Sequence, residues 1–213
     1  MGTTRHFLRS IGLPPGDLNE LPDSAKRFSD GAQYRLEIPS TEGPRCLDAV
    51  LEEADRLNVR IHRVSQGSGV FLHTDAELDE MAHTAAAARV LEQLGASTIN
   101  LPTDLSLAQI AAIRAAVDCP LDVYVEAPDN IGGFVRMHEI PELIRVAAPV
   151  YVKFGLRNAP DVYPAGTHLE ATTVALSRER VRRARLGLDL LTRSGYEPVT
   201  SELGAEGLAV PVV

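Results

Sequence analysis

Cysteine is scarce in this sequence, and the usual signals of export and membrane insertion are missing. Cys46 and Cys119 are the two cysteines among 213 residues, which is too few for a disulfide framework and fits a reducing compartment. No run of 18 apolar residues occurs, so we expect no membrane span. The first ten residues lack the apolar core of a signal peptide, and we therefore expect a cytoplasmic protein.

Positive charge is also in short supply. Lysine and arginine together number 21 against 29 aspartates and glutamates, which gives a net charge of −8 and a pI near 5.3. A domain that binds duplex nucleic acid usually needs a basic surface, so this balance argues against a nucleic-acid partner. Lys26 and Lys153 are the two lysines of the chain, which makes a lysine inside an expected strand notable.

The composition is that of an ordinary globular protein, with 45% hydrophobic and 23% charged residues. The length fits one domain. Residues 1–32 carry several prolines and glycines without periodicity, and we expect an irregular N-terminal segment there. Residues 33–194 are expected to form the domain, and residues 195–213 a C-terminal tail.

Strand and helix patterns alternate along the expected domain. Pro44 suits the first turn of a helix, and Thr74-Asp-Ala-Glu77 has the spacing of a capping box. This alternation predicts parallel βα units. The expected strands are residues 34–38, 59–65, 98–101, 121–126 and 150–154, and the expected helices are residues 44–57, 74–94, 106–117, 141–147 and 177–192.

Polar and apolar side chains alternate within each expected strand. Leu36 and Ile38 share one face of the first strand, while Arg35 and Glu37 share the other. Helices can then cover one apolar face and leave a polar face inside, which is typical of a (β/α) barrel rather than a doubly wound sheet. Because five strands cannot close a standard eight-stranded barrel, we expect an α/β fold that is TIM-barrel-like but shortened or incomplete, with parallel strands and helices on the outer face.

The apolar stripe of the expected helix 74–94 changes sides part of the way along. Leu78 and Met81 lie on one side of the helical wheel, and Val90 and Leu91 lie roughly opposite. A single helix buried on different sides at its two ends would give this pattern. Two different helices joined within residues 85–88 would give it as well.

Five segments of the sequence resemble segments of one known family. They are YRLEIPSTEGPRCLDAVLEEA, RIHRVSQGSG, INLPTDLSLAQIAAIR, LDVYVEAPDNIGGFVR and VYVKFGLRNAPDVYPAGTHLEAT. Together they resemble an actinobacterial-type member of peptidase family U32, the collagenase-like peptidases. The resemblance implies a TIM-barrel-like core and peptide-bond hydrolysis. Family members are longer, so we hypothesise an internal deletion of middle βα units near residues 85–90.

Some branches of this family are iron–sulfur proteins that support hydroxylation of RNA or of quinone precursors. Those branches use four cysteine ligands, whereas this sequence has two cysteines. A cluster-free relative of the hydroxylation branch therefore remains an alternative, and the cofactor stays unassigned. No CxxC pair, HExxH motif, GxSxG elbow or Walker loop occurs, and no metal ligands are proposed.

Chemistry in (β/α) barrels lies where the strands end and the βα loops begin. Glu37, Glu126 and Lys153 are expected to point inward at or near such ends, where two carboxylates and a lysine can serve as a base and an electrostatic stabiliser. We therefore predict these three as the catalytic residues, converging on the polar face. A buried ion-pair network that fills the barrel is the other interpretation.

The loops after the strands supply the predicted substrate-binding residues, which are Gln66, Asn100, Asp104, Arg157 and Asn158. We expect a peptide or small-molecule ligand and no membrane partner. The leading interpretation is a U32-type peptidase-like hydrolase, and a catalytically silent binding or scaffold protein built on the same barrel is the alternative from another class. Unpaired sheet edges would also favour a homo-oligomer.

Overall fold

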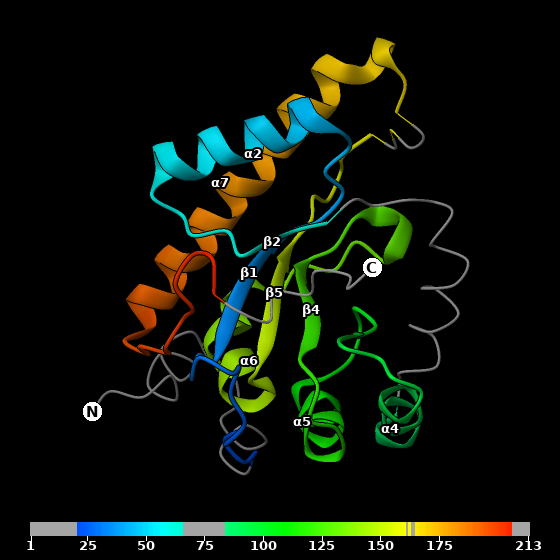
Figure 1. The fold of residues 1–213 in the computed structure, drawn as a ribbon, viewed down its shortest axis with the longest axis vertical. Helices are drawn as coiled ribbons and strands as arrows, with labels where there is room; N and C mark the ends of the chain where they lie inside the picture. Colours follow the sequence, from blue (N-terminus) through cyan, green and yellow to red (C-terminus); the bar gives the residue numbers. More distant parts are fainter. Residues whose placement is uncertain (1–20, 66–83, 161, 163–164, 206–213) are drawn as a thin grey trace.

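A computed structural model describes residues 21–65, 84–160, 162 and 165–205. Its centre is one parallel sheet in the order β2-β1-β5-β4-β3 (Figure 1). The strands are β1 (Tyr34–Ile38), β2 (Arg63–Val64), β3 (Ile99–Asn100), β4 (Leu121–Glu126) and β5 (Val150–Phe154). The strands curl into a half-barrel, which confirms the shortened, TIM-barrel-like α/β fold expected from the sequence.

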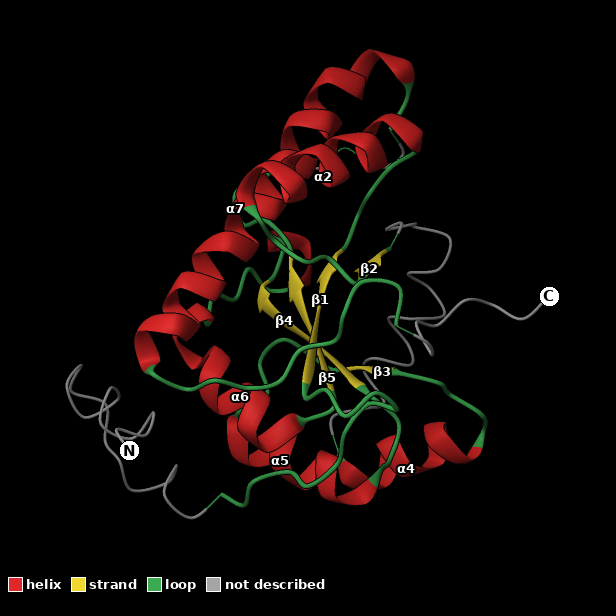
Figure 2. Cartoon of the chain, turned by 60° about the vertical axis from the view of Figure 1, so that its left-hand side comes forward, coloured by secondary structure: helices red, strands yellow, loops and turns green. Residues whose placement is uncertain are grey.

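The helices wrap the outside of this curled sheet (Figure 2). They are α2 (Pro44–Leu57), α4 (Ala85–Gln93), α5 (Leu107–Ala116), α6 (Ile140–Ala147) and α7 (Glu170–Ser194). Short 3-10 turns at Asp129–Ile131, Met137–Glu139 and Thr167–Leu169 complete the connections. Within the described residues, no helix is both long enough and apolar enough to span a lipid bilayer.

The core lies between the helices and one face of the sheet, as the alternation within the strands predicts. Leu36, Val123 and Val152 are at most 3% exposed and belong to one apolar cluster with residues of the covering helices. The packing is tight where α7 crosses the sheet, because a Cβ added at Gly187 would lie 2.7 Å from the ring of Phe154. Glycine at this position lets the helix approach the sheet closely.

The strand order places the opening of the half-barrel at one point in the chain. In a closed (β/α) barrel each strand pairs with its neighbours in sequence, and the last strand pairs with the first. Here β5 pairs with β1, and β1–β2, β3–β4 and β4–β5 are also paired. Within the described sheet, β2 and β3 are the two ends, so the barrel is open between Val64 and Ile99.

Most element boundaries lie close to those expected from the sequence, and four elements match them to the residue. β1, β4, β5 and α2 have the expected ends, whereas β2 and β3 are shorter than expected and α7 begins seven residues earlier, at Glu170 rather than residue 177. Short edge strands are common because only one side of each is paired. The expected capping box at residues 74–77 lies outside the described residues.

The expectation of an unbroken helix over residues 74–94 is wrong at Thr84. This residue has extended dihedral angles, and its hydroxyl accepts a hydrogen bond from the Ala87 N–H, so it is the N-cap of α4. The helix therefore starts where the apolar stripe changes sides. Ala88 and Leu91 supply the buried side of α4, whereas Val90, which was expected on the same side as Leu91, is 46% exposed.

Both ends of the described chain pack against the sheet. Phe28 is 7% exposed and stacks edge-on against Tyr151, with ring centroids 5.3 Å apart. Near the other end, the Gln33 N–H donates to the Val199 carbonyl, and the Val199 N–H donates to Oε1 of the Gln33 side chain. Ser201 is 2% exposed. The division into an N-terminal segment, a barrel and a tail stays a prediction.

Candidate functional site

Polar side chains from neighbouring strands stand in two levels on the inner face of the sheet. The β1–β5 register places Glu37 opposite Lys153, and Arg63 of β2 lies on the other side of Glu37. One level toward the strand N-termini, Tyr151 pairs with Asp122 of β4. Because parallel strands in register align their inward side chains, charges far apart in the sequence meet here.

Glu37 is the centre of a charged cluster formed by Glu37, Arg63, Asp122 and Lys153. Its carboxylate accepts a 2.7 Å hydrogen bond from Arg63 Nε and a 2.6 Å hydrogen bond from Ser65 Oγ. Its Oε1 also lies 3.6 Å from Lys153 Nζ. The Glu37 side chain is only 1% exposed, so nearly all of its stabilisation comes from these protein groups rather than from water.

Arg63 joins the two carboxyl groups of the charged cluster. It is ion-paired with both Glu37 and Asp122, and its guanidinium carbon lies 3.7 Å from the centre of the Tyr151 ring. Asp122 receives a further hydrogen bond from Thr98 at 3.3 Å through Oδ2, while its Oδ1 is buried without a hydrogen-bond partner. Two acids thus share one guanidinium, and one of the four carboxyl oxygens is left unsatisfied.

Lys153 completes the cluster from β5. Its ammonium group donates a hydrogen bond to Asn100 Oδ1 at 3.2 Å and lies 4.6 Å from the centre of the Tyr124 ring. The residue is 7% exposed. Burial by itself would lower the pKa of Lys153, but its interactions with Glu37, Tyr124 and Asp122 together outweigh burial and raise the pKa, so the lysine is a fixed cation.

The two carboxyl groups of the cluster differ in proton affinity. Burial tends to raise the pKa of Glu37, yet the charges of Lys153 and Arg63 and the Ser65 hydrogen bond outweigh it, and the pKa is lowered. Burial raises the pKa of Asp122, and the neighbouring Glu37 charge raises it further, against the opposing effect of Arg63. The cluster therefore holds one strongly ionised carboxylate and one carboxyl group that retains a proton more readily.

Glu126, the third predicted catalytic residue, does not join this cluster through its described contacts. The β4–β5 register shifts between Tyr124 and Glu126, so that Glu126 pairs with Phe154 instead of continuing the alternation. Its carboxylate accepts a 3.0 Å hydrogen bond from the Arg157 N–H and lies 3.7 Å from Nε of Arg183 on α7. The structure brings Glu37 and Lys153 together, and the described contacts of Glu126 are with Arg157 and Arg183 instead. The catalytic roles of the three residues stay predictions.

The predicted substrate-binding residues are scattered. Asn100 contacts Lys153, as described above. Asp104 is exposed on the loop after β3. Arg157 and Asn158 are also exposed, and both interact with Asp129, Arg157 through an ion pair of 3.5 Å. Gln66 lies outside the described residues. Their binding roles stay predictions.

Two members of the charged cluster, Arg63 and Asp122, were not selected from the sequence. The signal that selected Glu37 was also present for Asp122, because both alternate with buried apolar residues in their strands. Asp122 comes second in its strand, away from the carboxyl end where barrel chemistry is expected, and this position hid it. Arg63 alternates in step with Val59 and Ile61 in the expected strand 59–65, so the pattern assigned it to the apolar face, whereas the observed strand is only Arg63–Val64.

The N-terminal end of the polar face is closed by a second buried group. Arg35 is fully buried and donates hydrogen bonds to Ser201 Oγ at 2.7 Å and to the Tyr151 hydroxyl at 3.1 Å. Its guanidinium also lies 4.1 Å from the Phe28 ring centre. These contacts stabilise the bottom of the half-barrel, so the candidate site is the part above it, toward the C-terminal ends of the strands.

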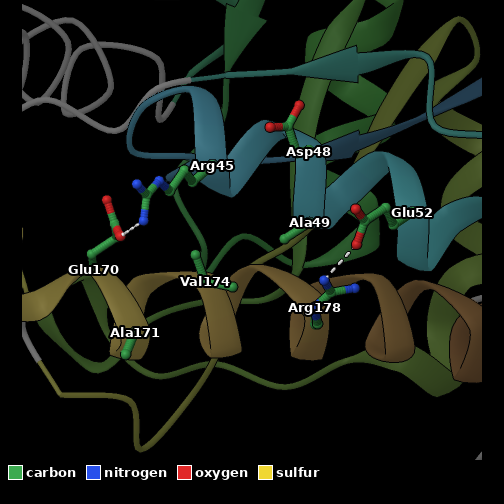
Figure 3. A pocket seen from close by; sticks show the side chains of 8 residues that line it. All are labelled: Arg45, Asp48, Ala49, Glu52, Glu170, Ala171, Val174 and Arg178. Carbon is green, nitrogen blue, oxygen red and sulfur yellow. Dashed lines mark hydrogen bonds and ion pairs between the residues drawn. The ribbon is translucent and has the colours of Figure 1, made fainter.

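A separate shallow groove of about 370 Å³ runs between α2 and α7 (Figure 3). Arg45 of α2 pairs with Glu170 of α7, and Glu52 of α2 pairs with Arg178 of α7 at 2.6 Å, across the groove. Its floor is lined by Ala49, Ala171 and Val174. The side chains that border it already satisfy one another, and the groove belongs to the packing of the outer helices.

Among the described residues, no three histidine, cysteine, aspartate or glutamate side chains are grouped as metal ligands would be. Cys46 is buried on α2, and Cys119 is half-buried just before β4.

Comparison with known families finds one similarity. A model of peptidase family U32 matches residues 63–127, which run from β2 to the end of β4. The match includes Arg63, Asn100 and Asp122 but stops short of Lys153 and begins after Glu37. It supports the resemblance to the U32 family over the middle of the chain. No curated protein matches the chain.

Proposed function

We propose that this chain is a U32-type peptidase-like protein that hydrolyses peptide bonds at the inner face of its half-barrel. The observation that carries the proposal is the pair of carboxyl groups, Glu37 and Asp122, which share Arg63 and have pKa values displaced in opposite directions. Such pairs divide naturally into a general base and a general acid. The family match over residues 63–127 supports the reaction class.

Each member of the charged cluster has a role in this proposal. Glu37, the ionised carboxylate, takes a proton from the attacking water. Asp122, which holds its proton more tightly, donates it to the amine that leaves when the C–N bond breaks. Lys153 and Arg63 are the cations available to stabilise the negative charge that develops on the carbonyl oxygen.

The proposal is tested by digestion of a peptide library, with products identified by mass spectrometry. We expect cleavage by the wild type and a loss of at least a hundredfold in Glu37→Gln and Asp122→Asn, since a general acid or base contributes about 10²–10⁴-fold. Asp55→Asn is the matched control, because Asp55 is an exposed acid on α2, outside the cluster and outside the predicted binding residues. Equal cleavage by all four proteins would contradict the assignment.

A second function, a catalytically silent binding or scaffold protein, is favoured by one specific observation. Glu37, Asp122 and Lys153 are at most 7% exposed, and the two acids and two cations of the charged cluster neutralise one another. A buried network of this kind can serve structure alone. In that case Glu37→Gln lowers stability, and no library peptide is cleaved above the buffer control.

We also propose that the chain derives from a longer actinobacterial-type U32 protein by loss of βα units between β2 and β3. The half-barrel is open only between these two strands of the described sheet, and α4 begins at Thr84, where the apolar stripe changes sides. A genomic read of the locus tests this origin. A longer uninterrupted frame would support it, and relatives of this same short length would contradict it.

A further inference from the structure

Arg180 of α7 is a buried cation with very few partners. It is 6% exposed, and its one hydrogen bond within the described part of the chain runs from Nη1 to the Ser40 carbonyl at 3.1 Å. Its Nε is buried and has no hydrogen-bond partner. No carboxylate of the described residues lies within ion-pair distance of it, and the negative charge of Glu42, in the loop after β1, acts on it only from farther away. A guanidinium has five N–H groups, so most of its hydrogen-bonding capacity is unused.

The other buried arginines that the structure describes have more partners, although Nε of Arg114 is also buried without a hydrogen bond. Arg35 forms an ion pair with Asp30 and donates hydrogen bonds to Ser201 and the Tyr151 hydroxyl. Arg136 forms an ion pair with Glu139. Arg114 has no carboxylate partner, but it donates to the Val117 and Cys119 carbonyls just beyond the end of α5, where the helix dipole favours positive charge. Arg180 lies inside α7 and has no comparable set of acceptors.

An uncompensated buried charge is costly, so its position is informative. Ser40, which accepts the hydrogen bond from Arg180, follows the carboxyl end of β1 and has a φ of 54°, unusual for a serine. The next residue, Thr41, is 6% exposed, and its hydroxyl is also buried without a partner. The loop after β1, on the side of the barrel where ligands bind, thus supplies the acceptor of Arg180 and, at the next residue, an unsatisfied hydroxyl.

Arg180 lies toward the same end of the strands as the charged cluster. Ser40, which accepts its hydrogen bond, is in the loop after β1 and is three residues beyond Glu37. Arg180 is therefore at the carboxyl-end side of the sheet, where the proposed reaction centre lies. A ligand held by Arg180 would lie across the carboxyl ends of the strands.

We propose that Arg180, together with the Thr41 hydroxyl, binds a carboxylate group of the ligand at the mouth of the half-barrel. A guanidinium matches the two oxygens of a carboxylate, and its single charge suits a monoanion better than a phosphate dianion. The proposal rests on the proposed function in taking peptides as the ligands. It assigns as preferred substrates the peptides that carry a free carboxylate near the bond to be cleaved.

Direct binding tests the proposal without requiring cleavage. The probes are N-acetyl-trialanine with a free C-terminal carboxylate, the same peptide with a C-terminal amide, and inorganic phosphate, each measured by calorimetric titration. We expect the wild type to bind the free peptide at least tenfold more tightly than the amide or phosphate, since charged hydrogen bonds are worth roughly one to two powers of ten in affinity.

Three variants separate ligand binding from a structural role. Arg180→Gln should lose the preference for the carboxylate, and Arg180→Lys should keep part of it through its charge. Arg193→Gln is the control, because Arg193 is an exposed arginine near the end of the same helix. Because Arg180 has so few partners, the urea midpoint of unfolding of Arg180→Gln should equal or exceed that of the wild type.

The outcomes are distinct for the two proposals. Equal binding of the acid and the amide, tighter binding of phosphate, or no binding by the wild type would overturn the assignment of Arg180. So would a stability loss in Arg180→Gln with carboxylate preference unchanged. Arg180-dependent binding without cleavage would instead leave this assignment standing and count against hydrolysis.

Discussion

Replacing Glu37 by glutamine is the sharpest test of how the polar face is held together. The change removes one negative charge from a group 1% exposed, next to Arg63 and Lys153. Arg63 retains Asp122, but Lys153 keeps only the Asn100 oxygen and the Tyr124 ring as close partners of its charge. The main energetic consequence is therefore a buried ammonium that has lost its counter-ion.

The size of the effect follows from the geometry. At the 3.6 Å separation of Glu37 Oε1 and Lys153 Nζ, and at an effective dielectric constant of about 20, the attraction is roughly 5 kcal/mol. Asn100, Tyr124 and the remaining Asp122 charge recover part of this. We expect Glu37→Gln to lower the free energy of unfolding by about 3 kcal/mol at pH 7, the lower end for a broken buried pair.

Urea unfolding followed by circular dichroism measures this change, with Asp104→Asn as the exposed control, expected within about 0.5 kcal/mol of wild type. In the double variant with Lys153→Met, the two losses should fall short of their sum by at least about 1 kcal/mol. The lowered pKa of Glu37 adds a pH test, because the cost of Glu37→Gln should shrink as the pH falls below about 4. A loss under about 1 kcal/mol, or additive losses, would refute this account of the cluster.

The remaining predictions concern other buried groups and the sheet ends. Because the folded pKa of Asp122 is raised, the wild type should lose stability relative to Asp122→Asn as the pH rises from about 4; a constant difference in urea midpoint would argue against the shift. Burial lowers the pKa of His62, whose Nδ1 accepts a hydrogen bond from the Leu36 N–H at 3.0 Å. The stability of the protein should therefore fall as the pH drops below about 6.5, and His62→Gln should remove this pH dependence. Burial and Glu92 raise the pKa of Cys119 to about 12, and Cys46 is 1% exposed. DTNB should therefore react rapidly with both thiols only after the protein unfolds, and fast labelling of the native protein would contradict this. β2 and β3 end the described sheet, so we expect pairing with another copy, with light scattering giving at least twice the 23.0 kDa chain mass; a stable monomer would overturn this expectation.

Most helices and strands, and the side of each that is buried, could be predicted from local sequence patterns. Period-two alternation identified β1, β4 and β5 to the residue, and Pro44 marked the first turn of α2. The same alternation predicted which side of the sheet the helices cover, because apolar side chains are removed from water when the chain folds. Local patterns of this kind need no knowledge of distant residues, so they can be read directly.

Which inward-pointing charged side chains contact one another depends on the three-dimensional arrangement of the strands. Arg63 reaches both Glu37 and Asp122 because β2 lies beside β1 and the sheet curls. Neither the strand order nor the curl can be predicted from the local sequence around Arg63. The register shift after Tyr124 takes Glu126 to Arg157 and Arg183 instead of Lys153. Partner choice in a buried cluster depends on strand order, register and curl, which are set by the packing of the whole sheet rather than by local sequence.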